Sequence, residues 1–575
     1  MLDQKTMTEQ LLKLDDSRRL TGPNLFGSKA AAVMDVLIIG YDHQLVIDRW
    51  QTELNSILEL LGWSKQSIFC RSYQAGASLG FTAPIDVLYA ATEVNEAAWQ
   101  RVVNHFTDTP QKPIEKSLSR LQKEITAEAN PALIALHQSA QSHDVRFLSD
   151  DDFVSLGYGA SCQVYPVDQL PAVDQVDWAA IESIPLALVT GTNGKSTTVR
   201  LASHVIKAAG LKCGITSTDY IRIDEQILDT GDYSGPGGAR TLLRHPDTEV
   251  AILEVARGGM LRRGLGVNQA HCAVITNVAA DHLGDYGMDT VSDMVAAKFV
   301  VRQALTPKQD LILNADDAGV VEFAQGQNND LNNEIVWFSW EAENPIIIKH
   351  LKQGGKAVYV RDGMICYHRG SEKATQVVSV TDIPITMNGA AKHNTHNALV
   401  VVAMMFSMKI ELSAIQTGLR TFDSSPKNNP GRGNLFQVKD FQVLVDFAHN
   451  EHGLAAMADT LKSMPANRRL VLLGQAGDRD NNLIKGLVNS ALLADPDCLV
   501  VCEMEEYLRG RELGEVPALI SQHAIQRGVR SNQIMTATSP LEGTKMALSW
   551  AQAGDVLLIL SLTDRDQVLE LIQNY

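Results

Sequence analysis

Residues 185–210 read PLALVTGTNGKSTTVRLASHVIKAAG, and this stretch determines the fold class of the chain. It opens with apolar and β-branched residues, passes through a turn that contains Gly191 and Gly194, and continues with apolar residues at helical spacing as far as Gly210. A buried strand that runs through a glycine turn directly into a helix is the first half of a parallel β–α–β unit. The stretch therefore predicts an α/β domain with a parallel sheet.

The turn between strand and helix has the residues of a phosphate-binding loop. Glycines let backbone N–H groups point at phosphate oxygens, and the helix N-terminus adds partial positive charge. The Lys195 ammonium neutralises phosphate charge, and the Ser196 hydroxyl is a ligand for Mg²⁺. A glycine turn without a ligand is the alternative, but the strand, the loop, the Lys-Ser pair and the helix occur together. We therefore expect the nucleotide to be bound by Gly191, Thr192, Asn193, Gly194, Lys195, Ser196 and Thr197.

Further strand-like runs follow the first one along the chain. EVAILEV (249–255), HCAVITN (271–277) and DLILN (310–314) predict buried parallel strands, and TVSDMVAAKFVVRQAL (290–305) predicts a helix that begins at a threonine. Residues 346–386 change to alternating β segments broken by glycine turns, which indicates an antiparallel insertion or sheet extension.

The chain divides into three predicted domains. Residues 423–433, which end in the run PKNNPGRG, are rich in Ser, Pro, Asn and Gly and predict a linker. We therefore expect a central ATP-binding domain at 181–425 and a Rossmann-like C-terminal domain at 426–575, preceded by a separate α+β domain at 1–180. In that first domain, MDVLIIGYD (34–42) and PIDVLYAA (84–91) read as strands.

Charge and hydropathy exclude several classes of partner. The 50 Lys and Arg residues stand against 67 Asp and Glu residues, so the formal net charge of −17 argues against binding to nucleic acid or to an anionic membrane. No apolar run is long enough to cross a bilayer, and the first residues carry no signal-peptide core, so we expect a cytoplasmic protein. The seven scattered cysteines predict reduced, mostly buried thiols.

The phosphate loop departs from the general G-x-x-x-x-G-K-[ST] form, because Val189 takes the place of the first glycine. The variant TGTNGKST resembles the loop of the Mur ligases and folylpolyglutamate synthetases. Further motifs resemble that superfamily in the same order along the chain: Glu254, Thr276-Asn277, Asp281-His282-Leu283, Lys298, Asn314–Asp317, His393-Asn394, Asn397, Pro430–Arg432 and Asp446–Asn450.

Other segments resemble the cyanophycin synthetases. They are GDYSGP (231–236), EVARGGMLRRGLG (254–266), GDRD (477–480), EEYLRGRELGE (505–515), RRLTGPNLFG (18–27) and LGYG (156–159). In those enzymes an ATP-grasp domain follows the N-terminal region, whereas here the phosphate loop comes too soon after LGYG to leave room for one. The resemblance therefore implies a relative with a single ligase site.

The resemblance also implies roles for individual residues. Glu254 and Ser196 would hold one Mg²⁺, and His282 and Lys298 a second, with Lys298 carbamylated as in Mur ligases; Lys195, Glu254, His282 and Lys298 would be catalytic. Without the resemblance, His282 reads as a structural histidine and Lys298 as a solvated lysine on a helix. Contacts to ATP are implied for Asn277, Asn397, Arg432 and Asp446.

Two groups of charged residues are candidates for substrate binding. Arg257, Arg262 and Arg263 have guanidinium groups that suit an acidic acceptor, although they could equally be surface charges. The second group consists of Asp478, Arg509 and Arg511, together with Arg479, at predicted strand ends of the C-terminal domain. The resemblance implies an amine-binding role for this group, because the family binds its amine there.

These observations indicate an ATP- and Mg²⁺-dependent ligase that activates a carboxylate as an acyl phosphate and joins it to an amino compound. A poly-γ-glutamate or folylpolyglutamate type of ligase would share every ATP motif, and a non-catalytic nucleotide-binding protein is the alternative from another class. The expected partners are a small-molecule or peptide carboxylate acceptor and an amine, and we also expect a homo-oligomer.

Overall fold

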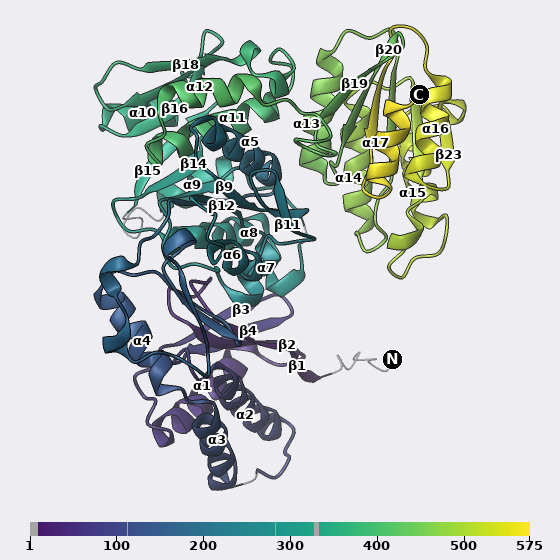
Figure 1. The fold of residues 1–575 in the computed structure, drawn as a ribbon. Helices are drawn as coiled ribbons and strands as arrows, with labels where there is room; N and C mark the ends of the chain where they lie inside the picture. Colours follow the sequence, from purple (N-terminus) through teal and green to yellow (C-terminus); the bar gives the residue numbers. More distant parts are fainter. Residues whose placement is uncertain (1–9, 112, 282, 327–332) are drawn as a thin grey trace, which may run out of the picture.

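The computed structural model describes residues 10–111, 113–281, 283–326 and 333–575. In Figure 1 the N-terminal part lies at the bottom, the central domain above it, and the C-terminal domain to the upper right. The central and C-terminal domains are each built around one β-sheet, and the N-terminal part contains two smaller sheets. The predicted multidomain α/β architecture is confirmed.

The N-terminal part begins with an antiparallel sheet in the order β1-β2-β4-β3, covered by helices. Its elements are β1 (Leu11–Leu20), β2 (Ala31–Ile39), α1 (His43–Leu60), β3 (Ile68–Tyr73), β4 (Gly76–Thr82), α2 (Leu88–Phe106) and α3 (Ile114–Glu128). The predicted strand at 34–42 corresponds to part of β2. The predicted strand at 84–91 is wrong, because residues 84–87 form a turn and residues 88–91 begin α2, whose buried residues Leu88, Ala91 and Val94 recur at helical spacing.

A second packed unit follows within the region predicted as one domain. It consists of α4 (Pro131–Ser142) and a small antiparallel sheet of β5 (Phe147–Ser149), β6 (Phe153–Leu156) and β7 (Gln163–Pro166), and it has its own apolar cluster. From β7 the chain passes through two short 3₁₀ turns, at 173–175 and 178–180, directly into the central sheet. The fully described stretch between LGYG and the phosphate loop holds no further domain, as the sequence predicts.

The central domain contains a long mixed sheet in the order β11-β10-β9-β12-β8-β13-β14-β15-β16-β17-β18. Its middle strands are parallel: β9 (Cys213–Thr216), β12 (Val250–Glu254), β8 (Leu186–Thr190), β13 (Cys272–Ile275), β14 (Asp310–Asn314), β15 (Glu334–Ser339) and β16 (Lys356–Arg361). The antiparallel edges are β10 (Tyr220–Ile223) with β11 (Gln226–Thr230), and β17 (Met364–Arg369) with β18 (Thr375–Ser379).

The predicted antiparallel insertion at 346–386 is an extension of this sheet. Its first residues differ from the prediction, because they form α10 (Pro345–Lys352) in place of a β segment. The side chain of Asn344 accepts a hydrogen bond from the Ile346 N–H, and Pro345 occupies the first helical turn, so this start has a local cause.

Alternate residues of the central strands pack into two different cores. On β8, Leu186 and Leu188 face one core, whereas Ala187 and Val189 face the other, as the two-residue repeat of a strand requires. The first core is covered by α6 (Pro236–Leu243), α7 (Arg257–Arg263), α8 (Val291–Lys298) and α9 (Ala318–Gly326); the second by α5 (Lys195–Ala208), α11 (Lys392–Ser407) and α12 (Leu412–Thr421). The carboxyl ends of β8, β12 and β13 therefore meet between two helical layers.

The C-terminal domain is a second α/β sandwich, as predicted. Its sheet has the order β19-β20-β24-β21-β22-β23 and is parallel apart from β19: β19 (Asn434–Val438), β20 (Phe441–Asp446), β24 (Val556–Leu560), β21 (Arg469–Leu473), β22 (Cys498–Cys502) and β23 (Ile534–Ala537). One face carries α13 (Glu451–Ser463), α14 (Asn481–Leu492) and α15 (Glu515–Gln526), and the other α16 (Pro540–Trp550) and α17 (Arg565–Gln573).

Two sequence expectations concern the environment of the whole chain. All seven cysteines are free, and five of them are buried, in agreement with the predicted thiols. Within the described ranges, every helix is too short or too polar to cross a lipid bilayer.

Candidate nucleotide and ligase site

A cavity of about 540 Å³ lies between the central domain and the C-terminal domain. Its walls are the phosphate loop, the carboxyl ends of the central strands, the start of α11 and the loop after β20. Predicted site residues that line it are Thr192, Asn193, Gly194, Lys195, Ser196, Thr197, Glu254, Asn277, Asn397, Arg432 and Asp446. The fold thus brings together in one cavity residues as far apart in the sequence as Thr192 and Asp446.

The phosphate loop depends on two glycines. Gly191 has φ 152° and Gly194 has φ 86°, both in the range that favours glycine. A Cβ atom on Gly191 would lie 1.8 Å from Oγ1 of Thr276, and one on Gly194 would lie 2.4 Å from Oδ1 of Asn397. Side chains at either position would therefore push the loop away from the strand end and the helix that support it.

Lys195 and Asn277 hold the loop in shape. Lys195 Nζ donates hydrogen bonds to the carbonyl oxygens of Gly191, at 3.1 Å, and Thr192, at 3.0 Å. Asn277 accepts from the Asn193 N–H through Oδ1 and donates to the Asn193 carbonyl through Nδ2, both at 3.0 Å. Asn277 lines the cavity, but its amide is already committed to the loop, so the structure places it as a support for nucleotide-binding residues.

Glu254 is buried at the end of β12, with 2% of its surface exposed. Neither carboxylate oxygen makes a hydrogen bond to the described residues. Burial raises the pKa of Glu254, while the charge of Lys195 and the nearby Ser196 hydroxyl lower it. A buried carboxylate without donors is costly unless a cation compensates it, and oxygen ligands suit Mg²⁺. The Glu254 and Ser196 side chains therefore fit the predicted metal.

Lys298 lies at the end of α8 and is buried, so its interpretation as a solvated lysine is wrong. Burial lowers the pKa of Lys298 well below its usual value, and the charge of Lys195 lowers it further, whereas Asp281 raises it. A lowered pKa increases the fraction of neutral amine, which is the form that reacts with carbon dioxide to give a carbamate. His282, the predicted partner of Lys298 at a second metal, lies outside the described residues.

Arg432 and Asp446 reach the cavity from the start of the C-terminal domain. The Arg432 side chain is half-buried, and its guanidinium lies 4.4 Å from the centre of the Phe447 ring. Asp446 accepts hydrogen bonds from the Gly433 N–H, at 2.8 Å, and from the Ala448 N–H, at 2.7 Å. Burial raises the pKa of Asp446, and the charge of Arg432 opposes that shift.

Contacts between the two domains close the cavity beside the phosphate loop. Asn193 and Asn450 exchange side-chain hydrogen bonds of 3.2 and 3.1 Å, and Asn193 also lies 3.0 Å from Nδ1 of His452. The sequence alone assigns no role to Asn450, although it belongs to the DFAHN motif. That motif is the signal from which its position at the site could have been inferred.

Asp219 forms a second link between the domains. It pairs with Arg565 of α17 at 2.6 Å and with Arg200, a fully buried residue of α5. Asp219 also lines the cavity. Sequence reasoning missed this group, because residues 219 and 565 are brought together only by the packing of separate domains.

His393 lines the cavity from α11, and the sequence places it in a motif without indicating its role. Burial lowers the pKa of His393 to about 4, so its imidazole is neutral near pH 7. A neutral buried imidazole can exchange hydrogen bonds with a base or a sugar.

The three arginines predicted to bind an acceptor do not line this cavity. The Arg257 guanidinium pairs with Asp285 at 2.7 Å, and Arg262 donates to the Tyr286 hydroxyl at 3.2 Å. Arg262 and Arg263 line a different cavity, between the N-terminal and central domains.

The residues predicted to bind the amine lie on neighbouring loops of the C-terminal domain. Arg509 pairs with Asp478, and Arg479 pairs with Asp281 of the central domain at 3.3 Å. Arg511 donates to the carbonyl oxygens of Gly477 and Arg479, each at 2.7 Å, so it supports the loop that carries Asp478.

Comparisons with known proteins agree with this architecture. Residues 189–405 match the Mur ligase middle domain, and residues 431–561 match the Mur ligase, glutamate ligase domain. Cyanophycin synthetase of Geminocystis herdmanii (strain PCC 6308) is 36% identical over 362 residues, which are 62% of this chain and 40% of that protein. The match to cyanophycin synthetase of Synechocystis sp. (strain ATCC 27184 / PCC 6803 / Kazusa) is 37% identical over 343 residues, 60% of this chain and 38% of that one. The chain thus spans about two fifths of the length of these curated relatives.

A more distant relative and two solved structures extend the comparison. UDP-N-acetylmuramoyl-L-alanyl-D-glutamate--2,6-diaminopimelate ligase of Listeria monocytogenes serovar 1/2a is 25% identical over 391 residues, 66% of this chain and 73% of that ligase. Escherichia coli FolC in complex with DHPP and ADP superposes with a TM-score of 0.51 at 21% identity, over 68% of this chain and 89% of that one. A bifunctional folylpolyglutamate synthase/dihydrofolate synthase with Mn, AMPPNP and L-glutamate bound superposes with a TM-score of 0.50 at 19% identity. The match covers 68% of this chain and 89% of that one. At these identities the two structures show the fold alone.

Proposed function

Residues 189–405 and 431–561 belong to the Mur ligase family, and from this premise we propose that the chain is an ATP-dependent ligase that joins a carboxylate to an amine through an acyl phosphate. The observation that carries the proposal is Glu254, a buried carboxylate without hydrogen-bond donors among the described residues, placed beside Lys195 and Ser196 in the cavity. This arrangement fits a metal ion bound between the protein and a triphosphate.

The loop residues perform the first part of the reaction. The Lys195 ammonium and the N–H groups at the start of α5 hold the phosphates in line with the acceptor carboxylate. Ser196 and Glu254 would hold Mg²⁺, which when bound neutralises the charge on the transferred phosphoryl group. Lys298, with His282, would contribute to a second metal site on the acceptor side.

The C-terminal domain serves the second part of the reaction, in which the amine attacks the acyl phosphate. An acyl phosphate is lost if water reaches it before the amine, so the site has to close around it. The links Asn193–Asn450 and Asp219–Arg565 hold the domain against the loop. Asp478, Arg479 and Arg509 are placed on loops from which the amine would enter, and Arg511 positions one of those loops.

The proposal is tested with a panel of acidic acceptors and amines, followed by mass analysis of the products. With an acceptor labelled with ¹⁸O in its carboxylate, the label is expected in released inorganic phosphate, and ADP is the expected nucleotide product. AMP and pyrophosphate, with the label in AMP, would contradict the acyl-phosphate mechanism. The same product analysis separates single addition from chain extension of the folylpolyglutamate or poly-γ-glutamate kind, and light scattering tests the proposed homo-oligomer.

A further inference from the structure

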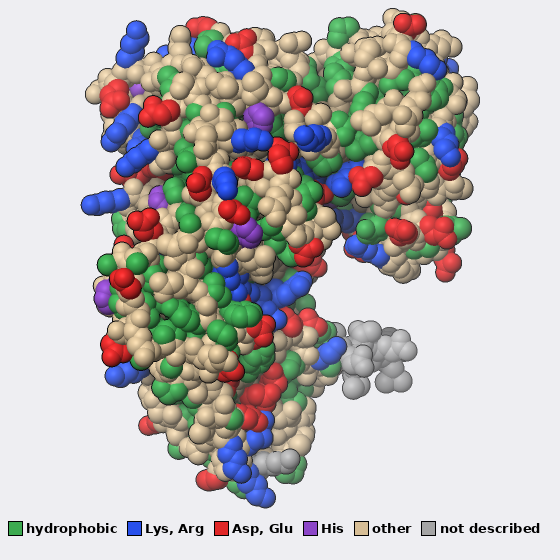
Figure 2. All heavy atoms as spheres, viewed as in Figure 1, with side chains coloured by type: hydrophobic (Ala, Val, Ile, Leu, Met, Phe, Trp, Pro, Cys, Tyr) green, Lys and Arg blue, Asp and Glu red, His purple; other side chains and the backbone are tan. Residues whose placement is uncertain are grey.

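The segment that joins the central domain to the C-terminal domain is tightly hydrogen-bonded. Figure 2 shows basic and acidic side chains side by side where these two domains meet. Residues 423–433 read as a linker in the sequence, yet Asn429 and Asn434 have 0% and 1% of their surface exposed. Asn434 donates to the carbonyl oxygens of Ser424, at 2.6 Å, and Asn429, at 2.9 Å. It also accepts a hydrogen bond from the Gly431 N–H at 2.7 Å. The segment is therefore a joint of fixed shape, because its buried amides are committed to partners.

Arg200 connects this joint to the phosphate loop. It lies on α5, the helix that begins at Lys195, and it is fully buried. Its Nε donates to the Tyr220 hydroxyl at 2.9 Å, one terminal nitrogen pairs with Asp219, and the other donates to Oδ1 of Asn429 at 3.0 Å. Because a guanidinium group is planar and all its nitrogens are donors, these three acceptors fix its position.

The side chain of Asn429 lies between Arg200 and the backbone of Arg432. Its Oδ1 accepts from Arg200, and its Nδ2 donates to the carbonyl oxygen of Arg432 at 2.9 Å. This orientation of the amide satisfies both neighbours, because arginine has only donors and a carbonyl oxygen only accepts. Nδ2 also lies 3.4 Å from Oγ1 of Thr197, and the Arg432 N–H donates to the Asn429 carbonyl at 3.1 Å. The backbone of Arg432 is thus tied to the phosphate-loop helix.

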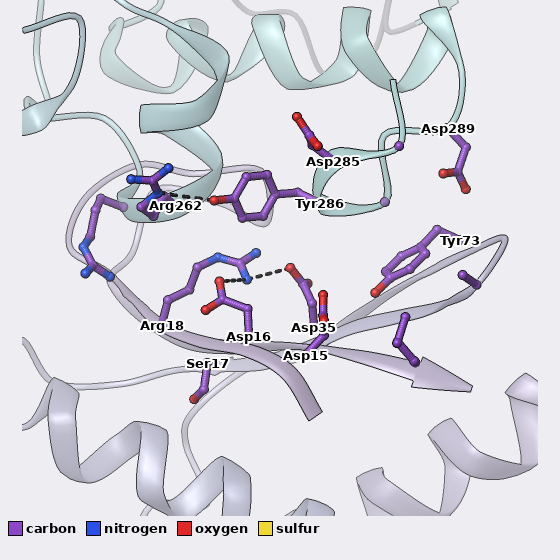
Figure 3. Close-up of a pocket in the computed structure, with 15 residues that line it drawn as sticks. Asp15, Asp16, Ser17, Arg18, Asp35, Tyr73, Arg262, Asp285, Tyr286 and Asp289 are labelled. Atoms are coloured by element: carbon purple, nitrogen blue, oxygen red, sulfur yellow. Dashed lines mark hydrogen bonds and ion pairs between the residues drawn. The ribbon is translucent and has the colours of Figure 1, made fainter. Parts of the chain in front are cut away.

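The side chain of Arg432 is held differently from an arginine in the other large cavity. This second cavity, of about 710 Å³, lies between the N-terminal part and the central domain, and Arg18 lines it (Figure 3). There Arg18 pairs with Asp16 at 3.0 Å and with Asp35 at 2.6 Å. In the described ranges Nε of Arg432 is buried without a hydrogen-bond partner, and the guanidinium packs on the Phe447 ring. The placement of Arg432 therefore depends on its backbone and on that ring.

Arg432 lies at the metal end of the nucleotide cavity. It lines that cavity together with Lys195, Ser196 and Glu254. Burial raises the pKa of Glu254, and the charges of Lys195 and Arg432 are among those that lower it, so the guanidinium lies near the proposed metal ligand. A guanidinium in this place suits the terminal phosphate of a nucleotide, because arginine matches phosphate oxygens in bidentate contacts.

We propose that Arg200 and Asn429 are positioning residues, which hold Arg432 where it binds the terminal phosphate of ATP. The assignment of ATP rests on the proposed function, whereas the series of contacts from α5 to Arg432 is independent of it. Through these contacts the phosphate loop and an arginine beyond the central domain keep one fixed relation. Without the Asn429 amide, Arg432 would remain in the cavity but would lose its alignment with the phosphate.

Calorimetric titration of the full chain with Mg²⁺-ATP and with Mg²⁺-ADP tests the proposal, because only ATP has the phosphate that Arg432 is expected to bind. Arg432→Ala should lower the ratio of ATP affinity to ADP affinity by about tenfold, the effect of one charge-assisted hydrogen bond. Asn429→Asp should lower this ratio by about as much. The new carboxylate keeps an acceptor for Arg200, which preserves the fold, but it removes the donor to the Arg432 carbonyl.

The double variant Asn429→Asp/Arg432→Ala separates positioning from an independent effect. If Asn429 acts through Arg432, the double variant should have the same ratio as Arg432→Ala, whereas independent effects would combine to about a hundredfold loss. Asn428→Asp is the matched control. It makes the same change at the neighbouring residue, whose amide donates to Asp423 at 2.6 Å, and should leave the ratio unchanged.

Arg200→Lys provides a second test that does not depend on the folding of Asn429→Asp. Lysine keeps the charge, but a single ammonium cannot contact all three acceptors of the guanidinium, so the ratio should again fall. An unchanged ratio in Asn429→Asp or Arg200→Lys, an additive double variant, or equal affinity of the wild type for ATP and ADP would overturn the proposal. A wild-type protein that binds neither nucleotide would instead refute the proposed function.

Discussion

The two cavities of this chain are built in different ways. The nucleotide cavity contains Glu254, a buried carboxylate with no hydrogen-bond donor in the described part of the chain, and six consecutive residues of the predicted phosphate loop, 192–197, line the same cavity. In the second cavity, the buried carboxylate of Asp35 is paired with Arg18 and accepts from the Ser78 hydroxyl at 2.6 Å. A buried carboxylate without hydrogen-bond donors suits a metal ion as its counter-charge, whereas one that is paired with an arginine stabilises the walls of the cavity.

The sharpest test of this contrast is Lys195→Ala. Because the ammonium faces the phosphates in both ground and transition state, ligation should fall by at least about a thousandfold and ATP binding should weaken. ADP release and calorimetric ATP binding measure the two effects. Lys207→Ala, in the same helix but on its exposed face and paired with Glu225, is the matched control and should retain activity. Normal turnover in a folded Lys195→Ala protein would disprove the phosphate-loop assignment.

Glu254→Gln should lower ligation by about a hundredfold, because the anionic metal ligand is lost. The same substitution should raise the melting temperature by a few degrees, since active-site charges are kept at the expense of stability. Differential scanning calorimetry with and without Mg²⁺-ATP measures this: the wild type should gain stability from the nucleotide and the variant should gain much less. A variant that is less stable than the wild type would show that Glu254 is already compensated within the protein.

Arg565→Ala should raise the KM for ATP by about tenfold, the effect of losing one partly buried ion pair, while kcat changes less. The reason is that Arg565 links the C-terminal domain to Asp219 without belonging to the phosphate loop. Steady-state kinetics provide the measurement. Arg530→Ala, at an exposed position of the same domain, should leave the KM unchanged.

Lys298→Met should increase the free energy of unfolding near pH 7 by about 1–2 kcal/mol, because folding no longer has to bury an ionisable group whose pKa it lowers. The pKa of Lys298 is lowered in the folded state, so the unfolded chain binds more protons, and wild-type stability rises with pH up to the ordinary lysine value of 10.5. The advantage of the variant should therefore shrink as pH increases. Urea titrations at several pH values measure this advantage. An advantage that is constant with pH would mean that the pKa of Lys298 is the same in the folded and unfolded states.

Much of the fold and part of the site were accessible from local sequence. The strand, glycine turn and helix at 185–210, the threonine that caps α8, and the linker at 423–433 all follow from short-range rules of periodicity, backbone conformation and capping. The failed strand at 84–91 shows the limit of the same rules, because a short apolar run can begin a helix as well as form a strand.

By itself the sequence determined the elements and the residues of the phosphate loop, because those depend on neighbours a few positions apart. Only the tertiary structure decided that Lys298 is buried, that Asp219 meets Arg565, and that Asn193 meets Asn450. It also decided that Asp15 of β1 and Arg262 of α7 line one cavity, although about 250 positions separate them along the chain. Such contacts depend on the packing of whole domains, and no local pattern records which distant surface a side chain will meet.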